Sequence, residues 1–503
     1  MTLTADPPAS PAVGIPAEAA GGHPDGDKAS ARRPLRVPGL HPAWIVVAMV
    51  AAGLARAALG AGVTNDAWWH WAAGQWMLDH HAVIRHDVFS YSVAGRPWVA
   101  EEWGFEVLLA ALVRLVGGAG FWVVSAGACV AALFVSVAQW RRHGAGMMRV
   151  AGLAAVAGAY LRYGQSPRPQ AVSYLCFAGL LLLLTLARRR TAWLAALPVL
   201  FCVWANLHGS FLAGLAVLAL DAALSFAPAA VGRLRVTCPL PRRAVGGTLL
   251  ASILATLVNP NGPGLLGYAW HVAFNPQLAA HISEWAPPPL GSPAVLLLVM
   301  APAALVGAVL LLTDATVEVF DVVVWGGLLV ASLHSERFLP YTGLAWCALA
   351  ARTFVRADRI RPTRLAWPLA AVMAGVLVVG HHVPAGAAAR GGGDGEPVAA
   401  VQWLGSHPGR VFAEYSWDDY LIAKGQKVFV DGRTDLYFGT GVLDTYWKVS
   451  GLAVDPDPVL ARWGVRYVLW PRSTPLAVFL GHDPRWRVAY RAGDSVVFAR
   501  DAP

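Results

Sequence analysis

The chain has 503 residues, of which 56% are hydrophobic and only 14% are charged. Its apolar residues come in runs of about 15 to 22, which is the length of membrane spans and excludes an ordinary soluble protein. The formal net charge of +9 does not favour nucleic-acid binding, because Lys and Arg are concentrated at the ends of the apolar runs, where such residues orient spans.

The N-terminal residues 1–38 are rich in Ala, Pro, Gly and charge, and they lack the compact apolar core of a signal peptide. They predict a disordered cytoplasmic tail. Residues 39–384 predict a polytopic α-helical membrane domain with about eleven spans. The expected spans are residues 41–62, 119–140, 147–162, 170–187, 191–206, 209–229, 244–258, 293–313, 318–334, 337–354 and 365–382.

Basic clusters set the orientation of these spans. If the basic tail lies inside, the arginine-rich segments between later spans also fall inside, as the positive-inside rule requires. The first loop, residues 63–118, then lies outside the cytoplasm. Its segment 104–116 is too short to cross about 30 Å at about 1.5 Å per residue, so we expect an interfacial or re-entrant helix there.

An odd number of spans also places the C-terminal residues 398–503 outside. A Gly-rich linker, residues 385–397, leads into them. They alternate short β-rich runs with helical stretches and predict a small extracytoplasmic α/β domain. The expected strands are 410–415, 427–431, 465–470, 485–490 and 495–500, and the expected helices include 398–405 and 456–463.

The first loop opens with a potential helix start. Thr64 or Asn65 can cap a helix whose first turn holds Asp66, and the spacing puts His70 on the same face one turn later. Asp66 has two interpretations. It stabilises the helix N-terminus through the macrodipole, or it is a general base whose partial desolvation raises its pKa toward the working range.

The rest of the first loop is dense in aromatic and ionisable residues. Four tryptophans suit either an interfacial belt or a sugar-stacking platform: Trp68, Trp69, Trp71 and Trp76. The spacing of the next polar residues, Asp79, His80, His81, His86 and Asp87, matches no specific zinc pattern. Glu101 and Glu102 follow a predicted turn at Ala94 and Gly95. Because adjacent side chains point in different directions on a helix, at most one of them is expected to face a shared site.

The loop resembles the first loop of the C-type glycosyltransferases. It lies directly after the first span, has Asp66 at a helix start, continues through "GQWMLDHHAVIRHDVFSYSVAGRPWVAEEW" and leads into a short helix. Further landmarks are "RPQ", "NLHG", "ISEW" and "VDGRTDLY", and "SWDDY" at 416–420 resembles the acceptor-reading motif of oligosaccharyltransferases. This chain departs from many relatives in having Asp66-Ala67 where they have a paired Asp-Glu. The resemblance implies that Asp66 contacts the acceptor nucleophile.

Such an enzyme must hold a phosphate leaving group, and outward cations at span ends suit that role. Snorkelling or ion pairing, for instance of Arg337 with Glu336, is the alternative role for them. In the C-terminal part, Asp431, Arg433 and Asp435 form either a turn-stabilising ion pair or a sugar or acceptor contact. The predicted substrate-binding residues are His70, Asp87, Glu101, Glu102, Arg162, Arg168, His208, Glu284, His334, Arg337, Asp431 and Arg433.

The sequence therefore predicts a glycosyltransferase in the cell membrane. It would move a sugar from a polyprenyl-phosphate donor to a glycan, lipid or protein acceptor of the cell envelope, with Asp66 as base and inversion at the sugar. The residues leave a divalent metal ion open as a cofactor. Two other classes stay in view: a flippase or transporter of lipid-linked sugar, and an inactive scaffold whose exported domain binds a partner.

Overall fold

The computed structural model describes residues 41–60, 63, 65–227, 230–231, 234–236, 240–273, 275, 285–289, 292–293, 296–312, 316–353 and 395–501. The predicted tail, the predicted span 365–382, most of the predicted linker and the predicted site residue Glu284 lie outside these residues.

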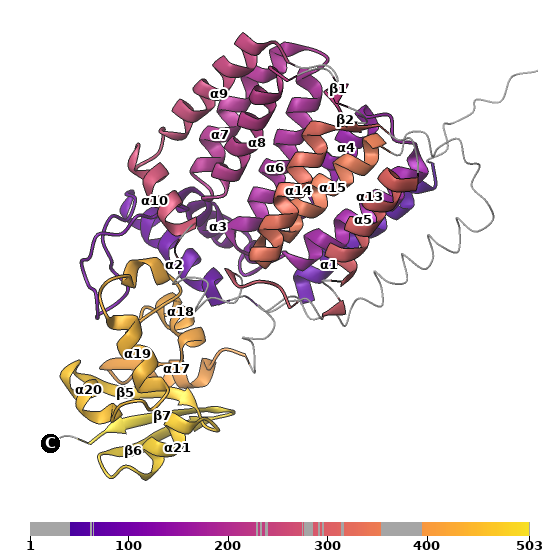
Figure 1. Ribbon diagram of the computed structural model, residues 1–503. Coiled ribbons are helices and arrows are strands. Elements are labelled where there is room, and N and C mark those ends of the chain that lie inside the picture. Colours follow the sequence, from indigo (N-terminus) through magenta and orange to yellow (C-terminus); the bar gives the residue numbers. More distant parts are fainter. Residues whose placement is uncertain are drawn as a thin grey trace, which may run out of the picture. The chain divides into compact units, whose positions relative to one another are not determined.

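The described residues up to 353 are mainly helical (Figure 1). The helices are α1 (Ala43–Gly60), α2 (Asn65–His80), α3 (Trp103–Val116), α4 (Ala119–Arg142), α5 (Met147–Tyr163), α6 (Pro169–Ala187), α7 (Ala196–Ala205), α8 (Phe211–Leu224), α9 (Arg242–Thr256), α10 (Gly264–Ala273), α13 (Ala301–Leu312), α14 (Val319–His334) and α15 (Leu339–Thr353). Each predicted span within the described residues overlaps one of these helices, so the prediction of a mainly helical fold is confirmed.

Two predicted spans begin with irregular turns. A 3-10 turn at Thr191–Ala195 precedes α7, and a π turn at Leu296–Met300 precedes α13. Pro198 and Pro302 lie just beyond these turns. A proline lacks the N–H of the helix ladder and its ring clashes with the carbonyl four residues earlier, so it fits the first turn of an α-helix but not the interior, and α7 and α13 begin just before their prolines.

Within the described part of the chain, α4 and α6 are long and apolar enough to cross a membrane. Five shorter apolar stretches accompany them: Ala43–Ala58, Thr191–Ala205, Phe211–Leu224, Leu297–Val306 and Val319–His334. The predicted number of spans stays a prediction. The helices share one apolar core, in which α4 packs against α6, and α5 packs against α1 and α15.

Residues 395–501 form a four-stranded sheet with helices around it. The strand order is β4 (Arg410–Ala413), β5 (Val465–Pro471), β7 (Ser495–Arg500) and β6 (Trp486–Ala492). β4 is parallel to β5, and the other pairs are antiparallel. The helices are α17 (Val398–Gly405), α18 (Tyr415–Ala423), α19 (Val442–Ser450), α20 (Pro456–Arg462) and α21 (Pro475–His482). A second, small sheet joins β1 (Ala230–Val231), β2 (Leu234–Arg235) and β3 (Val317–Glu318).

The predicted strand 427–431 is wrong. The segment does pair, but with the first loop instead of the C-terminal sheet. Val428 N–H donates to the Phe89 carbonyl at 3.1 Å, and Tyr91 N–H donates to the Val428 carbonyl at 3.0 Å. The β-rich composition indicated strand-like pairing correctly, but composition does not identify the partner. The helix α18 also packs against α2.

The first loop is built on the packing of α2 against α3. At Gly74 a Cβ atom would lie 1.9 Å from the backbone oxygen of Glu106 and 2.8 Å from Cβ of Ala110. Only glycine allows this approach, so Gly74 fixes the distance between the helix that carries Asp66 and the helix that carries Glu106. The 14 residues of α3 reach about 21 Å, as expected of a helix too short to cross a bilayer.

We expect Gly74→Ala to destabilise the folded protein by about 2 to 3 kcal/mol, because the neighbouring atoms are backbone and cannot yield. Thermal unfolding of the detergent-purified protein measures the effect. Gly53→Ala is the matched control, since Gly53 is also helical but a Cβ added there would have no atom within 4 Å. Equal melting temperatures for the two variants would contradict the close packing at Gly74.

Candidate active site

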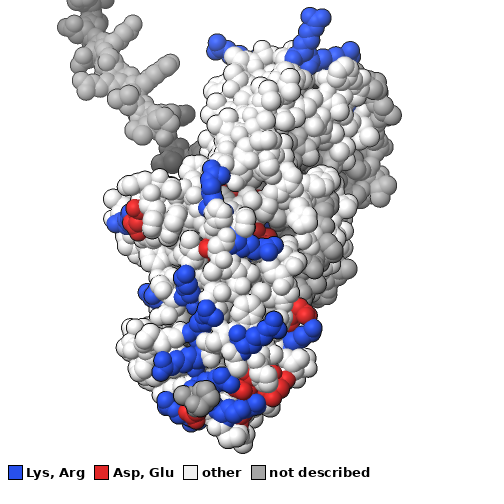
Figure 2. Space-filling view, turned by 90° about the vertical axis from the view of Figure 1, so that its left-hand side faces the viewer, with Lys and Arg blue, Asp and Glu red and all other residues white. Residues whose placement is uncertain are grey.

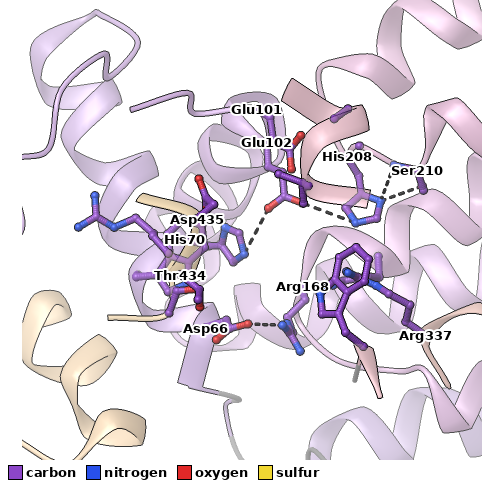
Figure 3. Close-up of a pocket in the computed structure, with 18 of the residues that line it drawn as sticks. Asp66, His70, Glu101, Glu102, Arg168, His208, Ser210, Arg337, Thr434 and Asp435 are labelled. Atoms are coloured by element: carbon purple, nitrogen blue, oxygen red, sulfur yellow. Dashed lines mark hydrogen bonds and ion pairs between the residues drawn. The ribbon is translucent and has the colours of Figure 1, made fainter. Parts of the chain in front are cut away.

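A cavity of about 560 Å³ lies where the first loop, the 206–210 loop and the C-terminal segment 432–435 meet (Figure 3). Its wall combines acidic, basic and aromatic side chains. The ionisable residues that line it are Asp66, His70, Glu101, Glu102, Glu106, Arg168, His208, Tyr268, Arg337, Tyr341, Glu414, Tyr415, Arg433 and Asp435.

A chain of histidines and glutamates runs along one side of the cavity. Glu102 lies between two histidines, with Oε2 3.6 Å from His70 Nε2 and Oε1 3.6 Å from His208 Nε2, as Figure 3 shows. The other nitrogen of His70, Nδ1, lies 3.3 Å from Glu106 Oε1. His70 thus connects Glu102, in the turn before α3, with Glu106, in the first turn of α3, and Glu102 connects His70 with His208.

Hydrogen bonds fix the tautomer of His208. The Ser210 hydroxyl oxygen accepts bonds from Trp204 Nε1 and from the Tyr341 hydroxyl, both at 3.1 Å. Its own proton is therefore directed to His208 Nδ1, 2.8 Å away. With Nδ1 as acceptor, the neutral ring carries its proton on Nε2, toward Glu102. Burial, Arg337 and Arg168 lower the pKa of His208 well below its usual value, so the ring is neutral.

Burial raises the pKa values of the glutamates. It raises the pKa of Glu101 to about 8, with Asp435 adding repulsion, and that of Glu106 to about 8. Burial and Glu101 also raise the pKa of Glu102. The pKa of His70 is lowered by burial and by Arg168. At neutral pH Glu101 and Glu106 are therefore mostly protonated, and the imidazoles of His70 and His208 are neutral.

Asp66 lies at the junction of the first loop and the C-terminal segment. It occupies the first turn of α2, as predicted, and forms an ion pair with Arg168, which precedes α6 (Figure 3). The backbone of Gly432 passes directly beside it. A Cβ on Gly432 would lie 2.9 Å from Asp66 Oδ1 and 2.9 Å from Asp419 Oδ2. The conformation of Asp66 is thus constrained from both parts of the chain.

Arg337 lines the cavity on the opposite side from the glutamates (Figure 3). Its guanidinium lies over the Trp285 ring, 4.2 Å from the centroid. No described carboxylate lies within 4 Å of it in an ion pair. The alternative that Arg337 pairs with Glu336 is therefore wrong, and Glu336 instead accepts a hydrogen bond from the Tyr163 hydroxyl at 2.7 Å.

Arg433 connects the C-terminal segment to the first loop. Its Nη2 lies 2.7 Å from Asp431 Oδ2 and 2.7 Å from Asp87 Oδ1. The guanidinium also lies over the rings of Phe89 and Trp98, 5.1 and 4.7 Å from their centroids. The turn-stabilising ion pair between Asp431 and Arg433 therefore exists, and it extends to an aspartate 346 residues earlier in the chain.

The structure sorts the predicted site residues into three groups. Those that line the cavity are Asp66, His70, Glu101, Glu102, Arg168, His208, Arg337 and Arg433. Asp87 and Asp431 are buried behind it as the partners of Arg433. Arg162 and the exposed His334 do not line it, and Glu284 lies outside the described residues.

Two corrections concern the glutamates. Both Glu101 and Glu102 line the cavity, because they form a turn before α3 and not part of a helix. Sequence reasoning missed Glu106, although its spacing of four from Glu102 at a helix start would have placed it on the same face. It also missed Ser210 and Tyr268, whose types and positions carry no comparable signal.

The polar residues at the end of α2 and just after it do not gather in one group. Asp79 pairs with Arg114 at 2.6 Å, and His80 stacks on Trp76. Among the described residues, no three His, Cys, Asp or Glu side chains are grouped so as to hold a metal ion. We assign no chemical step to a metal.

Comparison with known proteins identifies the fold class. The chain has the fold of the C-type glycosyltransferases, as the resemblance of its first loop predicted. No protein-family model and no curated protein sequence matches it.

The solved structures that it resembles include those of two transferases. The apo oligosaccharyltransferase of Archaeoglobus fulgidus matches with a TM-score of 0.59 and 11% identity, over 85% of this chain and 69% of that chain. The same oligosaccharyltransferase in complex with an inhibitory peptide and a dolichol-phosphate matches with a TM-score of 0.54, at the same identity and coverage. ArnT from Cupriavidus metallidurans, bound to undecaprenyl phosphate, matches with a TM-score of 0.52 and 14% identity, over 92% of this chain and 99% of that chain.

We expect Asp87→Ala to destabilise the protein by about 3 to 5 kcal/mol, because the Arg433 Nη2, the Ser90 N–H and the Ser90 hydroxyl all lose a buried acceptor. Asp79→Ala is the control: it removes an aspartate–arginine pair in the same loop, but an exposed one worth at most about 1 kcal/mol. Chemical unfolding in detergent measures both. Similar losses for the two variants would mean that the buried pair does not hold the C-terminal segment in place.

The raised pKa of Glu106 predicts a pH dependence of stability. The pKa is about 8 in the folded protein against an ordinary value of 4.5, so the folded state binds more protons between these values. Stability therefore falls as the pH rises from about 4.5 to about 8. Glu106→Gln should flatten this slope of melting temperature against pH, whereas the exposed Asp444→Asn should leave it unchanged. An unaltered slope in Glu106→Gln would show that Glu106 ionises normally.

Proposed function

We propose that the protein is a membrane glycosyltransferase that transfers a sugar from a polyprenyl-phosphate donor to an acceptor outside the cytoplasm. The observation that carries the proposal is the arrangement of Asp66, Arg168 and Arg337 around one cavity. An acid at the start of the first-loop helix thus lies beside cations suited to a lipid phosphate. Two proteins of the same fold were solved with dolichol-phosphate and with undecaprenyl phosphate.

The helical surface supports a membrane location. Large apolar side chains are exposed on several helices, among them Ile45, Val199, Leu250 and Val330. On the face in Figure 2, the upper, helical part is almost free of charged side chains except for Lys and Arg at its far end. Exposed apolar surface on this scale is stable in contact with lipid, not water. With the basic ends inside, the cavity opens on the outer side of the membrane.

Arg168, Arg337 and His208 form the phosphate end of the cavity in this proposal. All three groups line the cavity, and both arginines contribute to lowering the pKa of His208. A guanidinium can hold two phosphate oxygens at once, and the His208 Nε2 proton offers a further donor. Together they stabilise the negative charge that grows on the phosphate as it leaves.

Asp66 is the general base. The acceptor oxygen forms a bond to the anomeric carbon while the bond from that carbon to the phosphate oxygen breaks. The electron pair leaves with the phosphate, and the acceptor proton moves to Asp66. Displacement in line inverts the sugar. Arg168 contacts Asp66, so a phosphate that binds the same guanidinium competes with Asp66 for it and makes the carboxylate a better base.

Transfer by the purified protein from a polyprenyl-phosphate sugar tests the proposal. We expect Asp66→Asn to lower the rate about 10²-fold or more, since it keeps size and removes the base. Arg337→Ala should weaken donor binding by about 2 to 4 kcal/mol, and Arg337→Lys by less, because an ammonium cannot bind two oxygens at once.

Two variants outside the cavity serve as controls: Asp79→Asn and His334→Ala should leave rate and donor affinity unchanged. Full activity of Asp66→Asn would reject Asp66 as base. Movement of lipid-linked sugar across vesicles without any transfer would identify a flippase instead, and binding of donor without either activity would identify a scaffold.

A further inference from the structure

The cavity wall carries buried polar atoms that have no hydrogen-bond partner among the described residues. They include two donors, Trp69 Nε1 and Arg433 Nη1, two carboxyl oxygens, Glu101 Oε2 and Glu106 Oε2, and the amide oxygen Oε1 of Gln170. Glu106 is 0% exposed, Arg433 1% and Trp69 8%. Leaving such an atom unpaired costs about 1 to 3 kcal/mol, so a wall that concentrates them is built for a bound partner.

These atoms belong to one continuous surface. The rings of Trp69 and Trp98 meet edge to face, with centroids 6.0 Å apart. The Arg433 guanidinium lies over the Trp98 ring at 4.7 Å. The His70 ring lies against the Trp69 indole, with the ring centroids 3.6 Å apart and the planes tilted by 32°, and His70 Nδ1 lies 3.3 Å from Glu106 Oε1. We call the surface formed by Trp69, Trp98, Glu106 and Arg433 the ring wall.

The ring wall offers hydrogen bonds without an unbalanced positive charge. Asp87 and Asp431 together more than balance the charge of Arg433, so its remaining N–H suits an uncharged oxygen better than an anion. Burial raises the pKa of Glu106 to about 8, so its carboxyl is mostly protonated at neutral pH and does not attract a cation strongly. A hydroxyl group, which both donates and accepts, matches this combination of a fixed N–H and a carboxyl.

We propose that the ring wall binds the transferred sugar through its hydroxyl groups, and that the donor sugar is an uncharged, polyhydroxylated ring instead of an amino sugar or a uronic acid. Trp69 and Trp98 contact the apolar face of the ring, and Trp69 Nε1, Arg433 Nη1 and Glu106 contact its hydroxyls. This inference rests on the proposed function and adds the class of sugar to it. A cavity of about 560 Å³ has room for the ring beside the phosphate.

The test compares two tryptophans of α2. Trp69→Phe keeps an aromatic ring and removes the Nε1 donor of the ring wall. Trp71→Phe is the matched control: its Nε1 is also buried without a partner among the described residues, but Trp71 does not line the cavity. Affinities are measured on the full-length protein in detergent for decaprenyl phosphate and for the same lipid carrying glucose, mannose, galactose, glucosamine or glucuronic acid.

We expect the wild type to bind at least one neutral-hexose lipid more tightly than the bare lipid, the glucosamine lipid and the glucuronic acid lipid. Trp69→Phe should weaken binding of that neutral lipid roughly 3- to 10-fold, the loss of one hydrogen bond, and leave binding of the bare lipid unchanged. Trp71→Phe should change neither, and both variants should melt within a few degrees of each other.

Three results would overturn the inference. In the first, Trp69→Phe binds the neutral lipid as Trp71→Phe does. In the second, the lipid with the amino sugar or the uronic acid binds most tightly. In the third, the wild type binds bare and sugar-bearing lipids equally, which would contradict sugar binding by the ring wall but not phosphate binding by the cavity. Failure to bind even decaprenyl phosphate would overturn the proposed function as well, so the two failures are distinct.

Discussion

The structure around the cavity depends on one buried charge. The Arg433 guanidinium is removed from water and requires both Asp87 and Asp431, because its Nη2 donates to each of them and would lose an acceptor if either were absent. This requirement joins the first loop to the C-terminal segment. The backbone bonds at Val428 extend the same contact, and they hold the 432–435 turn against Asp66. The position of the proposed base therefore depends on an ion cluster of which only Arg433 lines the cavity.

The helices could be predicted because hydropathy acts locally, so each apolar run contains the information for its own helix. Two α-helices begin later than expected, because Pro198 and Pro302 interrupt the helix hydrogen bonds there. The C-terminal strands were predictable for the same reason. The segment 427–431 was not, because its pairing partner lies in the first loop, and strand composition carries no information about a partner so far along the chain.

The site was predictable in part. Asp66, His70 and the cations at loop ends stand out as polar groups beside apolar spans, and the structure brings most of them to one cavity. Their pairing is a tertiary property. Nothing in the sequence indicates that Arg168 contacts Asp66, that Arg337 lies over Trp285, or that Glu101 and Glu102 both face inward from a turn. Arg162 and His334 have the same sequence context as the lining cations but do not line the cavity, because local pattern does not specify the direction of a side chain.

The hydrogen bonds at Val428 have a consequence for biosynthesis. The chain is made from its N-terminus, so α2, α3 and Asp87 are complete long before the ribosome reaches Arg433. During that interval Asp87 lacks Arg433, and the cavity lacks the wall that residues 432–435 supply. The cavity is complete only when the last part of the chain has been synthesised. A nascent or prematurely terminated chain can therefore form its helices without a complete cavity.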